Sequence, residues 1–475
     1  MTTDLRPYSE YNDSGLPWLS RIPAHWEENR AKYYLREVDE RSATGDEQLL
    51  SVSHVTGVTP RKASVTMFMA ESNTGHKVCR QGDLVINTMW AWMAAMGVAR
   101  QVGLVSPSYG VYRPLRDDLY APEYVDHLLR TQPYASEYLC RSTGIRASRL
   151  RLYPEDFLGT RIIRPPLDEQ EAIVRFIRHH DQSIRRFILN RRRLIDVLNE
   201  QKQAIINRAV MRGLDPDVRL KPTGIEWLGD IPEHWRVLKI KRIAQVNPSR
   251  SEALHMRKSD EAVVFLPMER VSADGEIDVT ERRPIRDVWQ GFTYFRRGDV
   301  VVAKITPCFE NGKGACLSEL ATELGFGTTE LIVLRPSQDV TAEFLYQLTK
   351  ITQFRLLGVE SMTGAAGQQR VCPDFVADFV APVPPRDEQE EITAFIRSET
   401  VNYRASIDRA QREVDLICGY RTRLIADVVT GKLDVRGTAA AIDDPITDAD
   451  DPGEGMDDHE TLRDDEPELA EEDET

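Results

Sequence analysis

The sequence predicts an α+β protein made by internal duplication, with two α/β globules joined by two long antiparallel coiled-coil helices and a disordered acidic C-terminal tail. Three observations predict this fold. Two motifs occur twice along the chain, a long helical pattern follows the second motif in each copy, and strand-like runs broken by Gly and Pro fill the stretch between the motifs. A chain of 475 residues is also too long for a single hydrophobic core, so several domains are expected.

Two flanking motifs define the duplicated unit. A motif ending in Ile-Pro-x-His-Trp occupies residues 15–26 and returns at 224–235, and Pro-Pro-x-Asp-Glu-Gln occupies residues 165–170 and returns at 384–389. Between these motifs the two copies share only a thin framework of short matches, namely Gly82-Asp83 with Gly298-Asp299, Arg113-Pro114 with Arg335-Pro336, and Thr143-Gly144 with Thr363-Gly364. We infer that one unit was duplicated and that its two middle stretches diverged.

The middle stretches are predicted to be α+β globules, each with a strongly bent sheet. Short runs of β-branched and apolar residues, such as 83–87 and 299–303, are interrupted by Gly and Pro, which is typical of strands and turns. A short helical segment is expected within each globule, near residues 123–130 and 343–352.

A long helix is predicted to follow each Pro-Pro pair. In the first copy Asp168 and Glu171 fit a capping box, in which the Asp side chain accepts from a free N–H of the first turn and the Glu reaches back. The second copy repeats this pattern. Neither helical run contains Pro, and the two helices are expected to end near Gly213 and Gly431.

Apolar residues recur along both helices in steps of four and three, which predicts that the helices pack on each other as a coiled coil. About 45 residues rising 1.5 Å each would make a rod of roughly 65–70 Å. Because the second helix leaves the second globule, it has to run back along the first, which predicts an antiparallel pair related by a pseudo-twofold axis. The predicted seam consists of Ile177, Ile184, Ile188, Ile195, Leu198, Ile205, Ile396, Tyr403, Ile407, Val414, Ile417 and Leu424.

These patterns divide the chain into seven predicted segments. They are an N-terminal arm with the first His-Trp motif (1–26), a first globule (27–164), a first helix (165–213), a linker with the second His-Trp motif (214–235), a second globule (236–383), a second helix (384–434) and an acidic tail (435–475).

Composition and charge exclude several classes of protein. No run of eighteen apolar residues is present and the N-terminus lacks an apolar signal-peptide core, so we expect a cytoplasmic protein without membrane contact. The six cysteines form no Cys-x-x-Cys pair and are expected to be reduced and packed. Residues 437–475 hold 17 acids and one base, a charge of −16, and because the whole chain carries −15, the first 436 residues carry +1. The acidity therefore belongs to the tail.

Motifs for catalysis are missing from the sequence. It has no Gly-x-Gly-x-x-Gly, no Walker loop, no Gly-x-Ser-x-Gly and no Asn/Asp-Pro-Pro-Tyr/Phe, the motif with which adenine methyltransferases hold a flipped base. His25 and His234 recur within the His-Trp motif, which favours packing over catalysis, and His179-His180 is expected on a solvated helix face. We therefore expect no catalytic residue, metal site or cofactor in this chain, and no enzyme activity by itself.

Side chains around the two Thr-Gly turns are the predicted DNA contacts. The first turn is rich in arginine, which can clamp a phosphate or read guanine, and the second exchanges most arginines for glutamine, which can pair with adenine. Two tryptophans and two lysines that follow the Gly-Asp strands are further candidates. A solvated turn and, for the tryptophans, core packing are the alternatives. The predicted residues are Arg141, Arg146, Arg149, Arg151, Trp90, Trp92, Lys304, Lys313, Gln368, Gln369 and Arg370.

The first helix is also basic. Residues 165–213 contain ten Lys and Arg against six Asp and Glu. The run Arg191-Arg192-Arg193 could face phosphate, a partner protein or plain solvent, and the sequence leaves these three open.

Taken together, the repeated motifs resemble the specificity subunit of type I restriction-modification enzymes. The resemblance covers about residues 11–434, and the runs 303–315 and 327–330 are similar to runs seen in the recognition domains of that family. It implies that each globule is a target recognition domain that reads one half of a split, asymmetric site in double-stranded DNA. It also implies that the helices set the gap between the half-sites.

The resemblance implies partners as well. Two methyltransferase subunits would dock on the helices and methylate adenine with S-adenosylmethionine, and motor-nuclease (restriction) subunits would cut unmethylated DNA with ATP and Mg²⁺, as in defence against phage. The cofactors are therefore expected on partner subunits.

Two alternatives and one departure stay open at this point. One alternative is a scaffold whose two globules bind proteins, with the helices as spacer. The other is a self-sufficient restriction enzyme, which the missing cofactor motifs disfavour. The acidic tail from Gly437 to Thr475 is not part of the family pattern. It is expected to be a solubilising segment, or one that competes with DNA for basic surfaces until partners assemble.

Overall fold

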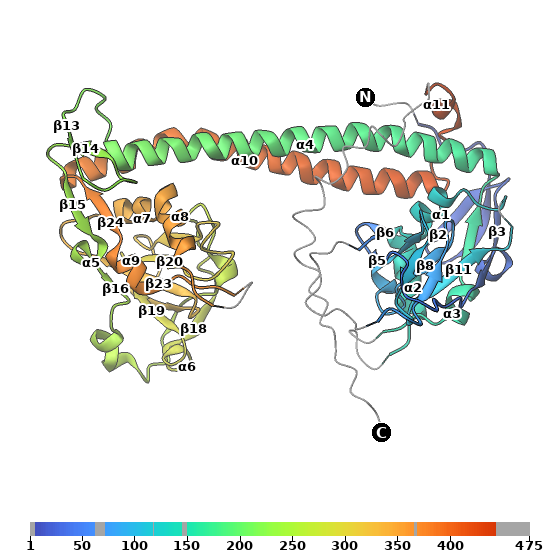
Figure 1. Ribbon diagram of the computed structural model, residues 1–475, viewed down its shortest axis with the longest axis horizontal. Coiled ribbons are helices and arrows are strands. Elements are labelled where there is room, and N and C mark those ends of the chain that lie inside the picture. Colours follow the sequence, from blue (N-terminus) through green and yellow to red (C-terminus); the bar gives the residue numbers. More distant parts are fainter. Residues whose placement is uncertain (1–4, 62–71, 117, 145–149, 365–367, 443–475) are drawn as a thin grey trace. The chain divides into compact units, whose positions relative to one another are not determined.

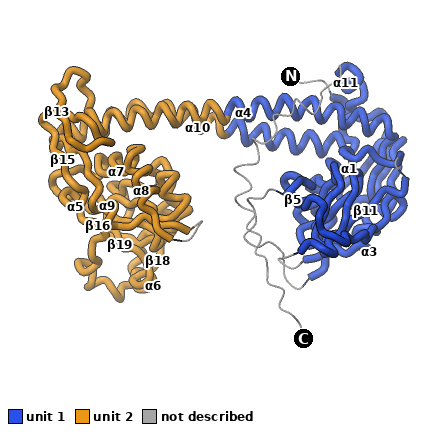
Figure 2. The backbone as a smooth tube through the Cα atoms, viewed as in Figure 1, with its two compact units in different colours: residues 1–191, 412–475 blue, residues 192–411 orange. Residues whose placement is uncertain are grey.

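The computed structural model describes residues 5–61, 72–116, 118–144, 150–364 and 368–442. The chain folds into two compact units, which Figure 2 distinguishes by colour. Unit 1 comprises residues 1–191 and 412–475, and unit 2 comprises residues 192–411. Each unit therefore holds one globule together with part of each long helix.

Many of the elements of unit 1 are labelled in Figure 1. The elements of unit 1 are β1 (Tyr11–Leu16), β2 (Leu19–Pro23), β3 (Glu27–Arg30), η1 (Ala31–Tyr33), β4 (Leu35–Glu37), β5 (Leu50–Ser53), β6 (Gly57–Pro60), β7 (Lys77–Cys79), β8 (Leu84–Ile86), η3 (Ala91–Met93), β9 (Met96–Val98), β10 (Gly103–Val105), β11 (Gly110–Pro114), α1 (Pro122–Leu129), α2 (Gln132–Arg141), α3 (Pro154–Gly159), β12 (Arg161–Arg164), the first part of α4 (Leu167–Arg212), the end of α10 (Arg386–Val429) and α11 (Arg436–Ala440).

The remaining elements belong to unit 2. They are β13 (Leu220–Pro222), β14 (Asp230–Pro232), β15 (Arg236–Lys239), α5 (Ile240–Ile243), β16 (Ala244–Val246), η5 (Arg250–Met256), β17 (Ala262–Leu266), η6 (Met268–Arg270), β18 (Arg282–Pro284), α6 (Ile285–Val288), β19 (Thr293–Arg296), β20 (Val300–Ala303), β21 (Gly314–Cys316), β22 (Leu324–Gly327), β23 (Leu331–Pro336), α7 (Ala342–Lys350), α8 (Thr352–Glu360), α9 (Pro373–Asp378) and β24 (Val380–Val383).

The duplication predicted from the sequence is visible in the sheets. Unit 1 has an antiparallel sheet of order β4-β11-β8-β9, and unit 2 has a sheet of order β16-β23-β20-β21 with the same connections. The pair β3 and β12 corresponds to β15 and β24, and the pair β1 and β2 to β13 and β14. Unit 2 adds a second four-stranded sheet of order β18-β17-β22-β19.

Strands β8 and β20 are buried on both faces, which places them at the centre of their globules. In β8, Leu84 and Ile86 belong to one hydrophobic cluster, while Val85 between them belongs to another. Strand β20 divides its valines in the same way, with Val302 in one cluster and Val301 in the other. This follows from the alternation of side chains across a strand.

The short helical segments predicted within the globules are confirmed as α1 and α7. The sequence analysis missed the helices that follow them. Helix α2 begins three residues after the end of α1, and α8 begins two residues after the end of α7. Helices α3 and α9 lie just before β12 and β24, respectively.

The two long helices are confirmed, with 46 residues in α4 and 44 in α10. They end where predicted, because Gly213 and Gly431 follow their last turns with φ of +75° and +76°, in the left-handed region that favours glycine. A Cβ on Gly431 would also lie 2.6 Å from a carbon of Pro23.

The predicted capping box is not what anchors the helix starts. Helix α4 begins at Leu167, so Asp168 lies inside the first turn rather than at the cap, and α10 begins likewise at Arg386, before Asp387. The acidic side chains still suit the positive end of the helix dipole. The next two residues of the motif, Glu and Gln, make the specific contacts.

We call these residues the Glu-Gln pair, which is Glu169 and Gln170 in unit 1. The Glu169 carboxylate accepts hydrogen bonds from Trp26 Nε1 at 3.1 Å and from the Tyr8 hydroxyl at 2.5 Å, and it lies 2.7 Å from His25 Nε2. The Gln170 amide accepts from Ala121 N at 2.8 Å and donates to Pro165 O at 2.9 Å. The pair therefore joins the His-Trp motif, the globule and the helix.

Unit 2 repeats these contacts with Glu388 and Gln389. Glu388 lies 2.7 Å from His234 Nε2 and accepts from Trp235 Nε1 at 3.0 Å, and Gln389 accepts from the Thr341 N–H at 2.8 Å. The two histidines of the His-Trp motifs thus have the packing role that the sequence predicts.

A second repeated contact is an Arg–Asp pair inside each globule. Arg113 donates from Nε and Nη2 to Asp83, both at 2.8 Å, and Arg335 donates to Asp299 at 2.8 and 2.9 Å. Both aspartates are almost fully buried. The hydrogen bonds that Arg113 donates to Asp83 and Glu40 raise the pKa of Arg113, so this guanidinium stays charged.

Within unit 1 the long helices run antiparallel. Asp181 of α4 pairs with Arg421 of α10 at 2.5 Å, and Arg191 of α4 pairs with Glu413 of α10 at 2.8 Å. The residue numbers therefore rise along α4 while those of their partners fall along α10. Val414 packs in one cluster with two seam isoleucines of α4.

The predicted seam residues are all buried or half-buried. Those of unit 1 that are buried are Ile177, Ile184, Ile188, Val414 and Leu424, with Ile417 packed beside them. In unit 2 Ile396 is buried in one cluster with Ile206, Ala209 and Val210 of α4, and the half-buried seam residues are Ile195, Leu198, Ile205, Tyr403 and Ile407. Ile206 carries more of the packing in unit 2 than the predicted Ile205.

Polar contacts join the globule of unit 2 to its helix segments. Lys202 on α4 pairs with Asp274 at 2.7 Å, and Gln203 donates to the carbonyl of Lys350 at 2.8 Å. The Lys350 amine is buried and donates to Ala273 O at 2.5 Å and Gly312 O at 2.8 Å. Burial and the neighbouring Arg355 lower the pKa of Lys350 to about 7.

The packed part of unit 1 continues beyond residue 434, where the acidic tail is expected to begin. Asp434 N donates to Arg6 O at 2.8 Å, and Val435 and Ala439 of the α11 region are fully buried in the unit 1 core. The rest of the predicted tail, residues 443–475, lies outside the described residues.

The Arg–Asp pair of unit 2 gives a first prediction. Asp299→Ala should lower the free energy of unfolding of unit 2 by about 3 kcal/mol, because it leaves the Arg335 guanidinium, 10% exposed, with only Glu252. Native-state hydrogen exchange of the β20 and β23 amides measures this. The matched control is Asp339→Ala, whose pair with Arg236 is 54% exposed on both sides and should cost no more than about 1 kcal/mol. Equal losses in the two variants would contradict the prediction.

Lys350 gives a second prediction. Its pKa is about 7 in the folded chain and 10.5 ordinarily, so between these values the unfolded chain binds a proton that the folded chain does not. The free energy of unfolding of unit 2 should therefore rise with pH over this window, by at most about 1.4 kcal/mol per pH unit from this group. The charged groups around the amine are Lys202, Asp274, Arg355 and Arg404.

Lys350→Met should remove that rise, as measured by urea unfolding between about pH 7 and 10. Lys239→Met, at a half-exposed lysine of the same globule, should keep it. A rise that is equally steep in both variants would assign the pH dependence to another group.

Candidate nucleic-acid interface

Each globule places a short hairpin beside the end of its central strand. In unit 1 Thr143 and Arg151 form an antiparallel bridge, and the next residue, Leu152, donates from its N–H to Thr88 O at 2.9 Å. In unit 2 Thr363 and Arg370 form the corresponding bridge, and Val371 donates to Lys304 O at 2.8 Å. The two Thr-Gly turns of the sequence analysis therefore occupy the same place on the same framework.

In unit 1 the hairpin lies beside the two predicted tryptophans. Trp90 and Trp92 are half-buried and their rings are stacked, with centroids 6.4 Å apart and 19° between planes. The Trp92 indole donates to Met89 O at 3.1 Å, and the Met89 side chain is exposed. Neither tryptophan is a fully buried core residue, which leaves part of each ring at the surface.

The arginines of unit 1 are only partly described. Arg141 ends α2, the helix that packs against η3 of the tryptophan segment, and its Nε donates to Glu137 at 2.6 Å. Arg151 belongs to the hairpin bridge. Arg146 and Arg149 lie outside the described residues.

In unit 2 the predicted residues come together from two loops. Lys304 and Lys313 open and close the loop between β20 and β21, and Lys304 N donates to Glu330 O at 2.9 Å. Gln369 exchanges hydrogen bonds with Thr306, through its N–H to Oγ1 at 3.1 Å and from Thr306 N to its carbonyl at 3.0 Å. Gln368, next to it, is exposed.

Arg370 is held by a carboxylate. Its Nε and Nη2 donate to Glu330 at 2.9 and 3.1 Å, and Nη1 donates to the Gln368 carbonyl at 3.2 Å. The sequence analysis missed Glu330 as a site residue. It stands in the 327–330 run quoted for the resemblance, but nothing in its spacing indicates a partner 40 residues later.

A polar cavity of about 370 Å³ lies next to Lys304. Arg250, Asn247 and Thr329 line it together with Lys304, and none of the described lining residues carries a carboxylate. Two basic side chains with hydroxyl and amide groups suit an oxyanion such as a backbone phosphate.

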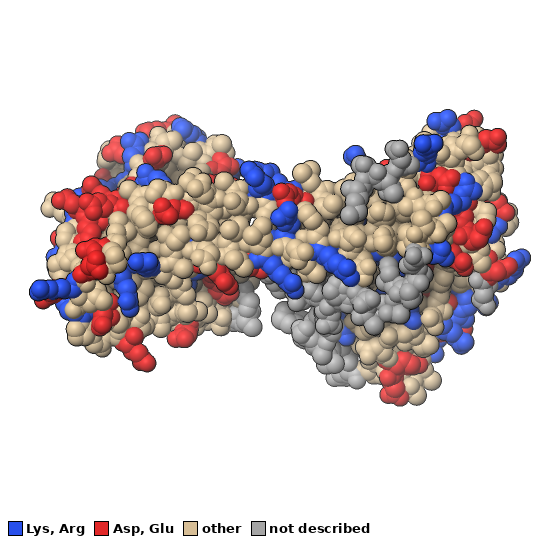
Figure 3. Space-filling model, turned by 90° about the horizontal axis from the view of Figure 1, so that it is seen from above, with Lys and Arg blue, Asp and Glu red and all other residues tan. Residues whose placement is uncertain are grey.

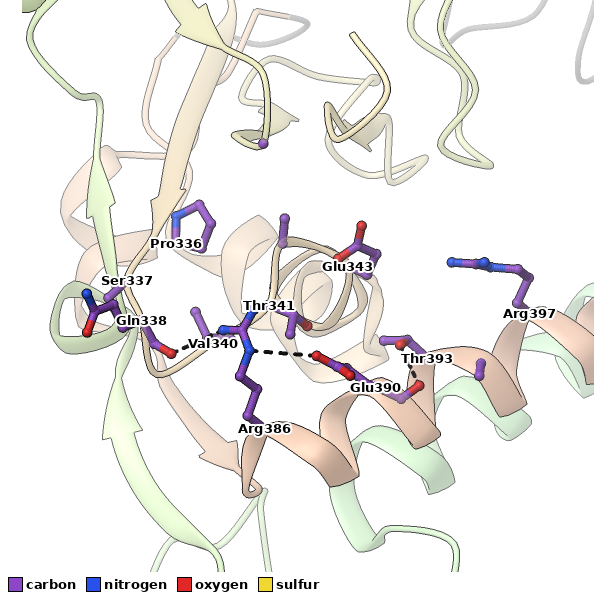
Figure 4. Close-up of a pocket in the computed structure, with 13 residues that line it drawn as sticks. Pro336, Ser337, Gln338, Val340, Thr341, Glu343, Arg386, Glu390, Thr393 and Arg397 are labelled. Carbon is purple, nitrogen blue, oxygen red and sulfur yellow. Dashed lines mark hydrogen bonds and ion pairs between the residues drawn. The ribbon is translucent and has the colours of Figure 1, made fainter.

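A larger open groove of about 800 Å³ lies where α7 meets the first turns of α10, as Figure 4 shows. Arg386 lies 3.7 Å from Glu390 and donates to Gln338 O at 3.2 Å, and Glu343 accepts from Ser318 at 2.7 Å. Acidic and basic groups are mixed here, so the groove lacks the one-sided charge that a polyanion needs.

Lys and Arg side chains stand over the middle of the long helices in the view of Figure 3, with Asp and Glu among them. Arg191 pairs with Glu413, so one member of the Arg191-Arg192-Arg193 run is bound within unit 1. His180 of the His179-His180 pair is half-buried against the Phe176 ring, 4.2 Å between centroids.

No three His, Cys, Asp or Glu residues in the part of the chain that the structure describes are placed to hold a metal ion, and the six cysteines are free. No helix among the described residues is long and apolar enough to cross a bilayer.

Comparison with known proteins supports the resemblance drawn from the repeated motifs. No protein-family model matches the chain. Over 166 residues, 34% of its length, the chain is 39% identical to the type I restriction enzyme EcoAI specificity subunit and 36% identical to the EcoEI specificity subunit, both of Escherichia coli. The match spans 27% of each of these relatives, so the chain aligns with about a quarter of their length.

A solved structure has the same fold over most of the chain. It comes from work on complex assembly and conformational transition of the type I R-M system, with a TM-score of 0.58 at 16% sequence identity, covering 87% of this chain and 99% of that chain. The chain is therefore similar in sequence to type I specificity subunits, and its fold is that of a chain from a type I R-M system.

Proposed function

We propose that this chain is the DNA-recognition subunit of a type I restriction-modification complex, in which each globule reads one half of a bipartite site in double-stranded DNA. The observation that carries the proposal is the hairpin closed by the Thr143–Arg151 bridge in unit 1 and by the Thr363–Arg370 bridge in unit 2. We call each hairpin, together with the strand end to which it attaches, a hairpin platform. The same framework carries Trp90, Trp92, Arg141 and Arg151 in unit 1 but Lys304, Lys313, Gln368, Gln369 and Arg370 in unit 2. Two equivalent surfaces with different base-reading side chains suit two different half-sites.

The helices give the proposal its geometry. We propose that α4 and α10 act as the spacer between the half-sites and as the docking site for two methyltransferase subunits, with motor-nuclease subunits joining them in the cytoplasm. S-adenosylmethionine, ATP and Mg²⁺ belong to those partners in this scheme. The chain itself is non-catalytic, and its residues bind and orient DNA for enzymes that the partners supply.

A protein-binding scaffold is the second candidate function. The mixed charge and the size of the groove at α7 and α10 favour it over DNA at that one surface. The hairpin platforms favour DNA, because hydrogen-bonding amides and half-buried basic side chains gather there.

The proposal predicts that the two globules can be exchanged independently. When the chain is co-expressed with its methyltransferase, host DNA should acquire N6-methyladenine at one bipartite motif. Replacing residues 27–164 by another recognition domain should change one half of that motif, and replacing 236–383 should change the other half. The Glu-Gln pair tolerates such an exchange because Gln170 and Gln389 bind backbone atoms of the globules.

Sequencing of methylated bases in the host genome measures the motif. If the methylated motif stays intact in both exchanges, the result would contradict DNA recognition by the globules and favour the scaffold. Both exchanges leave the helix residues 165–213 and 384–434 unchanged, so that the spacer stays constant, and each exchange serves as the control for the half of the motif that it should not alter.

Lys304 gives a further prediction for DNA affinity. Lys304→Ala in the assembled complex should weaken binding to all sequences about equally and reduce the slope of log affinity against log salt by about 1, because a phosphate contact is lost. The control is Lys239→Ala, which removes the same charge from β15, on a different sheet, where the lysine pairs with Asp378. Fluorescence anisotropy with a labelled duplex at several salt concentrations measures both. A loss confined to one sequence would make Lys304 a base contact instead.

A further inference from the structure

Glu330 joins the three segments that make the hairpin platform of unit 2. Its backbone carbonyl accepts from Lys304 N at 2.9 Å, and its carboxylate accepts from Arg370 at 2.9 and 3.1 Å. Arg370 is also bridged to Ile305 through the backbone. The strand end, the β22–β23 turn and the Thr363–Arg370 hairpin thus meet at one glutamate.

The geometry of this contact fixes the direction of the arginine. A guanidinium bound through Nε and Nη2 to both oxygens of one carboxylate lies in the plane of that carboxylate and cannot rotate without losing both bonds. Its third nitrogen donates to the carbonyl of Gln368, so the arginine also fixes the backbone that presents the two glutamines. The Arg370 side chain is 42% exposed, which keeps it within reach of a ligand.

Among its described residues, unit 1 has no carboxylate in the position of Glu330. Val85 pairs with Val111 in unit 1, and Val301 pairs with Val333 in unit 2. Ser108 stands three residues before Val111 and therefore takes the place that Glu330 takes before Val333. A serine hydroxyl cannot bind a guanidinium at two points, so the corresponding arginine, Arg151, is not oriented from this position.

We propose that Glu330 is a positioning residue for sequence recognition by unit 2, because it orients Arg370 and the Gln368-Gln369 segment toward the bases of the second half-site. This inference rests on the proposed function and deepens it. Glu330 itself faces the protein, and a carboxylate would repel the DNA backbone if it were not paired. Its effect on the DNA passes through the arginine and the two amides.

The test uses the full chain co-expressed with its methyltransferase, and the methylated motif is read from host DNA. Glu330→Gln keeps the size of the side chain but removes the charge and places an amide N–H against the guanidinium. We expect at least one base position in the half read by unit 2 to be relaxed, with discrimination falling roughly tenfold or more, as for the loss of an ordered side-chain contact to a base. The half read by unit 1 should stay unchanged.

Two further variants separate positioning from plain stability. Arg370→Lys keeps the charge but loses the planar fork, and it should relax the same base position as Glu330→Gln. Asp278→Asn breaks another ion pair of the same globule, the 2.9 Å contact with Arg270, and should leave the motif intact. Hydrogen exchange of β20 and β23 shows whether Glu330→Gln folds. If it does not, Arg370→Lys and Glu330→Asp carry the test. Glu330→Asp keeps the carboxylate and should therefore retain part of the discrimination of the unaltered chain.

Each outcome decides the inference. A relaxed second half with an intact first half supports it. An unchanged motif, with the methylation rate either intact or uniformly reduced, overturns it, because a structural role alone lowers the rate without changing sequence preference. Absence of motif-specific methylation with the unaltered chain would instead contradict the proposed function, so the two failures are distinguishable.

Discussion

The carboxylate at the start of each long helix is the constraint on which the two units depend. Glu169 is almost completely buried at the N-terminal end of α4, where the helix dipole, Tyr8, His25 and Trp26 compensate its charge together with the nearby Arg436. Gln170 then binds the backbone of the globule. A buried charge that needs these partners holds the N-terminal arm, the globule and the helix in one arrangement. The duplication repeats the His and Trp contacts at Glu388, which is half-buried.

A repeated framework carries the proposed recognition surfaces, which allows these surfaces to vary. Asp83 and Asp299 each fix an arginine of the neighbouring strand and a backbone N–H of the preceding turn. The hairpins attach to this framework through backbone hydrogen bonds, from Leu152 to Thr88 and from Val371 to Lys304, which do not depend on side-chain identity. The side chains of the hairpin can therefore change without a change of fold, as a family of readers for different sequences requires.

The sequence predicted what is local and missed what is distant. The helices, their paired seam and their ends at Gly213 and Gly431 follow from periodicity and from a glycine preference that acts over a few residues. The role of Glu169 depends on residues 143 and more positions away, so its motif was misassigned to a capping box. Glu330 was missed for the same reason, because Arg370 reaches it only when the sheet and hairpin have formed.

The charge of the chain gains a physical meaning from these contacts. Residues 1–436 carry +1, yet several of their arginines are already neutralised by carboxylates of the same globule, including Arg113, Arg335, Arg370 and Arg141. Paired arginines release few counterions on binding a duplex, and counterion release is the main source of affinity that does not depend on sequence. Under the proposed function, such a chain holds reading side chains in fixed directions, and most of its affinity for DNA would come from the partner subunits that the proposal assigns to it.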